Sequence, residues 1–428
     1  MKLIFISLLL FTSSIVYGQK KDGIRFEHGK TWAQIKDQAK TENKYIFLDC
    51  YTLWCAPCRY MAQEIFTQSA VGAFFNKNFI SVAVQFEKGK NDGPEVKQWY
   101  KDAELLGKIY KINLYPTYLF FKPDGQLVHT VYGGSKTAKE FMTKVKPALT
   151  PATQFATLKK QFDAGNRSPQ FLLTLINATK QSNNQGFLPI VINVYLAKQQ
   201  NLFTDENINL AVLATQKSTD PGFAMLKNNP ERADAVVGNG KSASIVKDIA
   251  FNEIVLPGLR KNGKRTFSGP MITYQGILIK HVNWAAIKTS LDKSYPTLSD
   301  EILLAAKPVY YQWATDWRHY TEAVTAYKAA YKEKLPNTTL NNYAWEAYML
   351  SADTSCLNAA LTWSNHVLKS DDNKPRMWYL LTHASLLYKL GRKAEAIPEM
   401  RHLVDMTGDK DGTYFLTLEK MKAGERTW

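Results

Sequence analysis

The sequence predicts an α/β domain followed by an all-α region, and three observations carry this prediction. An apolar run from Tyr45 to Leu48 is typical of a buried strand, and it is followed by two closely spaced cysteines and a helical stretch. Further apolar runs at 79–86 and 117–121 alternate with helical stretches up to about residue 149. From residue 151 onward the pattern is helical with polar turns, and no alternating strand pattern persists.

A chain of 428 residues is too long to fold around a single hydrophobic core, so several domains are expected. With 45% hydrophobic and 21% charged residues, the composition is that of a globular protein. We expect a leader at 1–18, an α/β domain at 19–149, a helical domain at 150–334 and helical repeats at 335–428.

The first eighteen residues resemble a secretory signal peptide. A single basic residue, Lys2, precedes an apolar core from Leu3 to Phe11 and a polar end at Val16-Tyr17-Gly18. The apolar core is too short to span a bilayer, and no later run is long enough to do so. We therefore expect an exported protein, periplasmic or secreted, cleaved near Gly18; the alternative is an uncleaved anchor.

The formal net charge of +16 does not indicate nucleic-acid binding. The basic excess is spread over both halves of the chain, and no basic stripe or nucleic-acid motif is present. Solubility and an anionic envelope surface explain the charge, so no nucleic-acid partner is expected.

Within the α/β region the pattern predicts elements in a definite order. We expect a short strand at 24–26, a helix at 31–43, strands at 45–51 and 79–86, a helix at 57–76 between them, a loop at 88–94, a helix at 95–110, a hairpin of 117–121 with 126–132, and a last helix to Leu149 capped by Ser135.

The spacing of Cys55 and Cys58 predicts redox chemistry. At the start of a helix, Cys58 lies one turn beyond Cys55 on the same face, which is close enough for a disulfide. The free N–H groups of the first turn stabilise a thiolate at Cys55, and Pro57 is tolerated there because its missing N–H has no intrahelical partner. Cys55 would attack a substrate disulfide and Cys58 would resolve the mixed disulfide.

A cysteine pair with this spacing can also bind zinc or form an inert structural disulfide. A zinc site needs about four ligands, and no second C-x-x-C or H-x3-5-H accompanies the motif. Trp54 and Pro57 around the pair argue against an inert disulfide, which stays the alternative to redox chemistry.

Four sequence features together resemble the thioredoxin-fold domains of the thiol–disulfide oxidoreductase superfamily. They are Trp54-Cys55-Ala56-Pro57-Cys58, Asp49 six residues before the first cysteine, Tyr115-Pro116-Thr117 before an apolar run, and Gly133-Gly134 before a last helix. The resemblance covers about residues 24–149. It implies a thioredoxin fold, with Cys55, Cys58 and Asp49 as catalytic residues.

The resemblance also implies roles around the cysteines. Asp49 would exchange a proton with the buried cysteine, and Pro116 would be a cis-proline that faces the disulfide. The alternatives are an Asp49 that turns to solvent or to the turn backbone, and an ordinary trans proline. Two departures from the family are visible: no lysine near Val84-Gln85 partners the acid, and Tyr115 is larger than the usual residue before this proline. The residues expected to shape the site are Trp54, Ala56, Pro57, Tyr115, Pro116 and Thr117.

The remaining cysteines, Cys50 and Cys356, are expected to be buried thiols. Cys50 follows Asp49 in the same strand and so points to the opposite face. A Cys50–Cys356 disulfide is the alternative.

Residues 339–408 resemble tetratricopeptide repeats. Ala344 and Ala384 lie 40 residues apart, and Ala360 and Ala396 lie 36 apart, near the period of about 34 for this repeat. Small residues at these positions allow paired helices to approach closely. An ordinary helical bundle is the alternative. The tryptophans of this region (Trp313, Trp317, Trp345, Trp363 and Trp378) are expected to be mostly core.

The sequence supports two hypotheses of different kinds. The first is an exported thiol–disulfide oxidoreductase, more a reductase than an oxidase because Ala56-Pro57 is close to the reductive Gly-Pro pattern. Its partners would be protein disulfides or dithiols and an upstream redox partner, with no cofactor beyond the Cys55–Cys58 pair and no transmembrane segment. The helical repeats would recognise substrates, partners or a second copy. The second hypothesis is an adaptor whose repeats bind partners while the thioredoxin-like domain is a scaffold.

Overall fold

The computed structural model describes residues 23–182, 184, 186–268, 271–370, 376–409 and 412–428. The predicted leader at 1–18 lies outside these residues. By its internal contacts the chain forms two compact units, one up to Thr215 with 220–222, the other comprising 216–219 and 223–428. This division falls inside the predicted 150–334 segment, and the predicted domain boundaries stay predictions.

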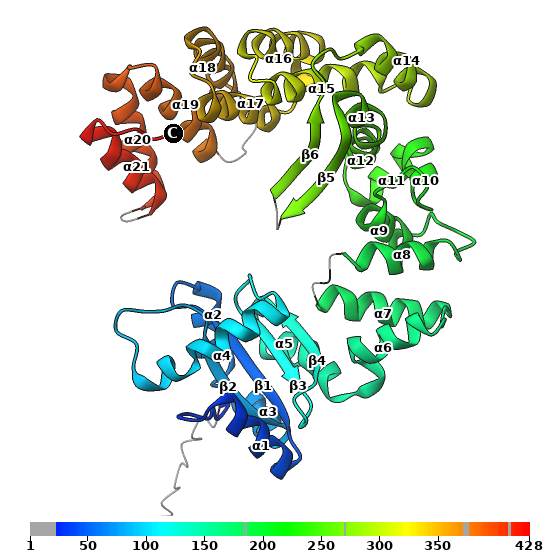
Figure 1. Cartoon of the computed structure of the whole chain (residues 1–428), viewed down its shortest axis with the longest axis vertical. Helices are drawn as coiled ribbons and strands as arrows, with labels where there is room; N and C mark the ends of the chain where they lie inside the picture. The colour runs from blue at the N-terminus through cyan, green and yellow to red at the C-terminus, as the bar shows by residue number, and fades with distance from the viewer. Residues whose placement is uncertain (1–22, 183, 185, 269–270, 371–375, 410–411) are drawn as a thin grey trace, which may run out of the picture. The chain divides into compact units, whose positions relative to one another are not determined.

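The first unit is built on a mixed sheet with strand order β2-β1-β3-β4 (Figure 1). The strands are β1 (Tyr45–Tyr51), β2 (Phe79–Gln85), β3 (Thr117–Phe121) and β4 (Leu127–Tyr132). β1 pairs in parallel with β2 and antiparallel with β3, and β3 pairs antiparallel with β4. The central strand β1 therefore has a paired neighbour on each side, and its residues are the most strictly positioned in the unit.

Helices cover both faces of this sheet. On one face, α1 (Trp32–Glu42) and α4 (Pro94–Tyr110) pack their apolar residues against Ile46, Leu48 and Cys50 of β1. On the other face, Phe47 contacts the aromatic residues of α3 (Ser69–Asn78) and α5 (Ala138–Val145) through a shared cluster. Because side chains alternate along a strand, Asp49 belongs to the face of Phe47, whereas Cys50 belongs to the opposite face.

Most predicted elements of this unit are confirmed, with three corrections. The short strand predicted at 24–26 is only an isolated bridge between Phe26 and Ser81. The helix predicted at 57–76 is interrupted: α2 (Ala56–Tyr60) continues into a π-helical turn (Met61–Ile65), and α3 starts only at Ser69. The C=O of Phe66 accepts the N–H of Ile24, so this carbonyl is used by the N-terminal segment at the break. The last helix is capped by Thr137, whose hydroxyl accepts the N–H of Glu140, and not by Ser135.

The first unit extends beyond the sheet into further helices. They are α6 (Phe155–Asp163), α7 (Pro169–Gln181), α8 (Leu188–Leu196) and α9 (Asp205–Ala214). α6 and α7 pack against β4, and α8 packs in turn against α7 and α9. Residues 164–168 separate α6 from α7.

The second unit is largely helical, as predicted. Its helices are α10 (Phe223–Asn228), α11 (Pro230–Val237), α12 (Lys241–Ala250), α13 (Leu256–Leu259), α14 (Trp284–Ser294), α15 (Ser299–Trp313), α16 (Trp317–Tyr331), α17 (Asn337–Leu350), α18 (Thr354–Leu368), α19 (Arg376–Lys389), α20 (Lys393–Thr407) and α21 (Thr413–Ala423). A π-helical turn (Phe251–Val255) joins α12 to α13.

One β-hairpin departs from the all-α prediction. β5 (Arg260–Ser268) pairs antiparallel with β6 (Met271–Leu278), and the polar stretch Asn262-Gly263 forms a bulge inside β5. Asn262 has a φ of 57°, which fits the bulge. The hairpin packs through Tyr274, whose ring lies 4.9 Å from that of Trp313, and through an ion pair of Arg265 with Asp248. These tertiary contacts hold the hairpin, in which β5 is rich in charged residues and β6 contains none.

The helices from α17 to α21 pack successively against one another. Ala344, Ala360, Ala384 and Ala396 are all fully buried, which agrees with close helix approach at these positions. The repeat symmetry itself stays a prediction. Among the tryptophans of this region, Trp363 is core as expected, whereas Trp378 is 54% exposed.

In the part of the chain that the structure describes, no helix is both long enough and apolar enough to cross a membrane.

Candidate active site

The two cysteines of the C-x-x-C motif form a disulfide at the carboxyl end of β1. The Cα atoms of Cys55 and Cys58 lie 5.3 Å apart. Cys55 is the N-cap of α2 with extended backbone (φ −76°, ψ 98°), and Pro57 occupies the first turn of this helix. The predicted local structure of strand, turn and helix start is therefore confirmed.

The sulfur of Cys55 receives a hydrogen bond from the helix start. The backbone N–H of Cys58 donates to Cys55 Sγ at 3.1 Å. A donor that points at this sulfur stabilises negative charge on it, which favours a thiolate at Cys55 after reduction. Solvent exposure does not distinguish the two cysteines, since Cys55 is 2% exposed and Cys58 is 5% exposed.

Asp49 lies beneath the disulfide as a buried carboxyl group. Its side chain is 6% exposed, and its Oδ1 atom has no hydrogen-bond partner. Burial disfavours the charged form and raises the pKa of the Asp49 carboxyl from 3.8 to about 7. The carboxyl neither turns to solvent nor binds the turn backbone through Oδ1, so it is available to exchange protons near neutral pH.

The strands beside β1 supply no cation to this acid. The parallel register places Ala83 of β2 opposite Asp49, and the antiparallel register places Tyr118 of β3 opposite it. The hydroxyl of Tyr118 is buried without a hydrogen-bond partner, and its pKa is raised well above the usual value by burial and then by the Asp49 charge. The predicted lack of a lysine on the neighbouring strand holds in the structure, because Ala83 occupies the facing position.

The segment before β3 contains the predicted cis-proline. The Tyr115–Pro116 peptide bond is cis, and the C=O of Pro116 accepts the N–H of Gly133 at 2.8 Å. Thr117 is fully buried, and its hydroxyl donates to the C=O of Leu114 at 2.6 Å. A Cβ on Gly134 would lie 3.6 Å from Cβ of Pro57, so the 133–134 turn lies against the start of α2.

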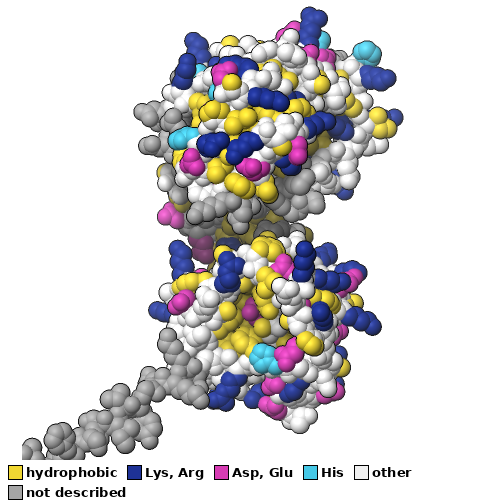
Figure 2. Space-filling model, turned by 90° about the vertical axis from the view of Figure 1, so that its left-hand side faces the viewer, with side chains coloured by type: hydrophobic (Ala, Val, Ile, Leu, Met, Phe, Trp, Pro, Cys, Tyr) yellow, Lys and Arg dark blue, Asp and Glu magenta, His cyan; other side chains and the backbone are white. Residues whose placement is uncertain are grey.

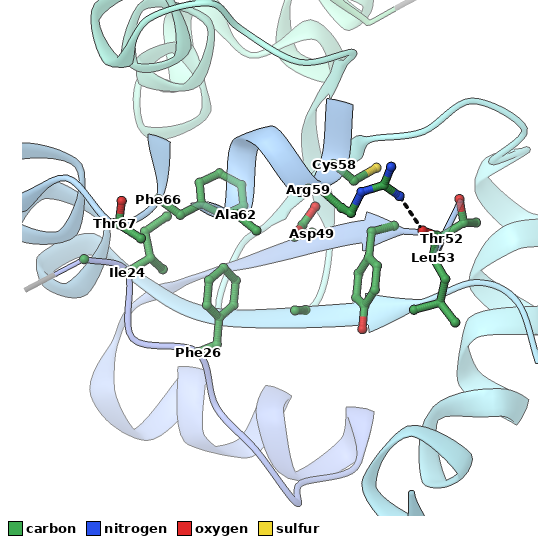
Figure 3. A pocket seen from close by; sticks show the side chains of 13 residues that line it. Ile24, Phe26, Asp49, Thr52, Leu53, Cys58, Arg59, Ala62, Phe66 and Thr67 are labelled. Atoms are coloured by element: carbon green, nitrogen blue, oxygen red, sulfur yellow. Dashed lines mark hydrogen bonds between the residues drawn. The ribbon is translucent and has the colours of Figure 1, made fainter. Parts of the chain in front are cut away.

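Three contacts hold the exposed lip of the site. The ring of Trp54, which is 68% exposed, meets the ring of Tyr115 edge-to-face with centroids 5.9 Å apart. Next to it, the N–H of Leu53 donates to the Glu87 carboxylate, and the C=O of Leu53 accepts from Arg59 Nη1 at 2.7 Å (Figure 3). The lip of Leu53 and Trp54 is therefore held by the nearby Arg59 and by Glu87 and Tyr115, which are distant in sequence.

Comparison with known proteins agrees with this geometry. Residues 33–148 match the family model of the thioredoxin-like domain. Thioredoxin H4 of Arabidopsis thaliana is 32% identical over 105 residues, which are 24% of this chain and 73% of the plant protein. Thioredoxin-2 of Pyricularia oryzae is 32% identical over 108 residues, 25% of this chain and 52% of the fungal protein.

The chain belongs to the thioredoxin-like family. Its thioredoxin-like region is a domain of the thiol–disulfide oxidoreductase type, because the matched residues include the Cys55–Cys58 disulfide. The chain spans about half the length of the fungal relative, and the matched residues are about a quarter of this chain.

Two solved structures resemble the same part of the chain. A solution structure from Bacteroides thetaiotaomicron is 31% identical and covers 30% of this chain and 95% of its own. A DsbH oxidoreductase is 22% identical and covers 34% of this chain and 94% of its own. Both have a TM-score of 0.25.

The sequence did not mark two residues that lie near the site. Glu87 accepts the N–H of Leu53, and Tyr118 lies opposite Asp49 in the register of β1 and β3. Glu87 precedes a polar loop and Tyr118 belongs to an apolar run, so composition marks neither of them. Only the strand register and the return of the loop bring them to the site.

The other cysteines of the thioredoxin-like protein are free thiols. Cys50 and Cys356 are both buried and unpaired with another cysteine, as expected for inert core residues. Burial raises the pKa of the Cys50 thiol, and the neighbouring Asp49 charge raises it further. Among the described residues, no group of three or more His, Cys, Asp or Glu side chains is placed to hold a metal ion.

Proposed function

We propose that this protein is an exported thiol–disulfide oxidoreductase that reduces disulfides in protein substrates. The observation that carries the proposal is the Cys55–Cys58 disulfide at the start of α2, with the Cys58 N–H directed at Cys55 Sγ. Membership of the thioredoxin-like family supports the same chemistry.

The first step uses Cys55 as the nucleophile. In the reduced protein, the Cys55 thiolate attacks one sulfur of a substrate disulfide, forms a new S–S bond and expels the other substrate sulfur as a thiolate. The Cys58 N–H stabilises the attacking thiolate, and the cis-proline segment lies on the same end of the sheet to receive the substrate chain.

The second step uses Cys58 and Asp49. The Cys58 thiol gives its proton to the Asp49 carboxylate, and the resulting thiolate attacks Cys55 Sγ and releases the second substrate thiolate. The substrate disulfide gains two electrons, and the Cys55–Cys58 pair becomes the disulfide. A dithiol electron donor then reduces Cys55–Cys58 for the next cycle. Asp49 suits this role because its raised pKa of about 7 allows it to accept and return a proton near neutrality.

The helical part of the chain would select substrates or partners. The exposed Trp378 supports this role, because a large exposed aromatic side chain is a typical anchor in protein interfaces. The adaptor hypothesis uses the same surface but needs no redox chemistry. Export rests on the resemblance of residues 1–18 to a signal peptide.

The experiment that tests the function is a measurement of the reduction potential of residues 19–428 in glutathione buffers, with Cys55→Ser as the control. A reductase should have a potential near about −250 mV or lower. A value near about −150 mV would instead indicate an oxidase or isomerase. If no dithiol titrates in the wild type, the enzyme proposal is wrong and the adaptor hypothesis stands.

A further inference from the structure

A cavity lies beneath the active-site helix on the side of the N-terminal segment. Its volume is about 600 Å³, which is within the range of pockets that hold small organic ligands. The lining comes from the N-terminal segment, β1, the following turn, α2 and its continuation, and β2, and the cis-proline segment contributes none of its described residues. Cys58 and Leu53 also line it, so the cavity adjoins the active site but does not include the cis-proline segment proposed to receive a substrate chain.

The walls of this cavity are mostly apolar. Ile24, Phe26 and Phe66 form one side, and Ala62 and Ala83 line it with small side chains (Figure 3). Figure 2 likewise shows hydrophobic side chains gathered on one face of this unit. Such walls favour binding of the hydrocarbon part of a ligand, because binding removes apolar surface from contact with water.

One acidic group breaks the apolar lining. Asp49 lies between the apolar wall and Cys58, and its buried Oδ1 has no hydrogen-bond partner (Figure 3). Within the described residues no cation lies within ion-pair distance of this carboxyl, and the facing residue on β2 is Ala83. A buried, unpaired carboxylate is costly, so a donor that enters the cavity gains a strong hydrogen bond there.

We propose that this cavity binds a small amphipathic amine, whose hydrocarbon body fills the apolar part and whose ammonium group donates to Asp49. The inference goes beyond the redox function and does not depend on it, because the acid and the apolar walls of the disulfide form carry it without any redox step. Arg59 at the rim does not reverse this preference. Its guanidinium is exposed to solvent and already donates to the C=O of Leu53.

The test compares three ligands with the same body and different head groups. 2-Phenylethylamine, 2-phenylethanol and phenylacetate are titrated separately into the purified wild-type protein by calorimetry. We expect saturable binding of the amine at one site and at least about tenfold weaker binding of the alcohol, because a hydrogen bond from a charged donor to the carboxylate is stronger than one from a neutral hydroxyl. Equal binding of amine and alcohol, stronger binding of phenylacetate, or no binding of the amine would overturn the proposal.

Three variants locate the site. Asp49→Asn should bring the amine's affinity down to that of the alcohol while leaving the alcohol's affinity unchanged. Ala83→Leu should weaken both ligands, because Ala83 is an exposed residue that lines the cavity and a larger side chain fills it. Ala70→Leu, an exposed alanine of α3 outside the lining, is the matched control and should change nothing.

The outcome of the variants is decisive in both directions. If Ala83→Leu and Ala70→Leu bind the amine equally well, the ligand is not in this cavity. The near-ultraviolet circular dichroism and the reduction potential of Ala83→Leu should match the wild type, which separates loss of binding from loss of fold. A protein that titrates as a dithiol but binds no amine refutes this inference alone.

Discussion

Two acidic side chains, one in each unit, occupy similar interiors and differ in their partners. Asp49 in the sheet of the first unit has a buried oxygen without a hydrogen bond, and its pKa is raised to about 7 by burial. Glu346 in α17 of the second unit also has its pKa raised by burial, but the Tyr320 hydroxyl donates to it at 3.1 Å and opposes that rise. Among the described carboxyl groups, Asp49 alone has a buried oxygen left unpartnered.

This difference suits Asp49 to a role in proton transfer and Glu346 to a structural role. An unsatisfied buried carboxyl costs stability, and a fold retains it where something else is gained. Asp49 shares its cavity with Cys58 of the disulfide. Glu346 instead joins α17 to α16 through Tyr320, whose hydroxyl also donates to the C=O of Tyr343.

The largest expected effect comes from removing the sulfur that Asp49 is proposed to serve. Cys58→Ser should stop turnover after the first step, with disulfide reductase activity reduced at least about 100-fold, since the resolving nucleophile is lost. A mixed disulfide through Cys55 should accumulate, and mass spectrometry after incubation with a disulfide substrate would detect it. Cys356→Ser, a buried thiol in the second unit, is the matched control. Full turnover by Cys58→Ser would contradict the proposed mechanism.

A pH-dependent stability effect should mark Asp49. Its folded pKa lies above the unfolded value, so the folded state binds the extra proton between about pH 4 and pH 7, and stability falls as pH rises through this window. Asp49→Asn removes the charge and should be more stable than wild type at pH 8 by up to about 4 kcal/mol, with little gain at pH 4. Chemical denaturation of the oxidised protein at both pH values measures this. An equal gain at both pH values would show that the effect is not ionisation.

A core truncation in the second unit should leave the Asp49 behaviour unchanged. Leu386 in α19 is fully buried in the core of the helical unit, and Leu386→Ala should cost about 3 kcal/mol through lost burial and a cavity. We expect the unfolding transition of the second unit to shift, while the reduction potential and the pH dependence assigned to Asp49 remain those of the wild type. A changed potential would show that the helical unit tunes the disulfide.

The sequence predicted the first unit closely because its constraints are local. The strands at Tyr45–Tyr51 and Thr117–Phe121 have the predicted bounds, and the disulfide and the cis-proline follow from short motifs. The helix after Cys58 was predicted too long, because its break depends on Ile24, which is distant in sequence and binds the C=O of Phe66. The same kind of distant contact places Glu87 at the lip of the site.

The second unit was predictable as helical but not in its exceptions. The hairpin joins a charged strand, β5, to an uncharged strand, β6, and it packs through Tyr274 against Trp313 and through the ion pair of Arg265 with Asp248. The burial of alanines such as Ala384 could be predicted from their regular spacing, because closely packed helices require small residues at their contact positions. The cavity beneath the disulfide was not predicted. Ala83 lines it opposite Asp49, and this position follows only from the pairing register of β1 and β2, which the sequence does not show.

The smallest expected effect concerns the paired acid. In Glu346→Gln the amide oxygen still accepts the Tyr320 hydroxyl, so the free energy of unfolding at pH 7 should change by less than about 1 kcal/mol. Burial also raises the pKa of Glu346, so its charge weakens stability as pH rises, and the substitution should flatten that dependence only slightly because Tyr320 stabilises the charged form. Denaturation curves from pH 4 to pH 8, measured beside those of Asp49→Asn, would compare the two acids directly. If Glu346→Gln gained as much stability at pH 8 as Asp49→Asn, a hydrogen-bond partner would not be what distinguishes them, and the separation of chemical from architectural acids in this protein would fail.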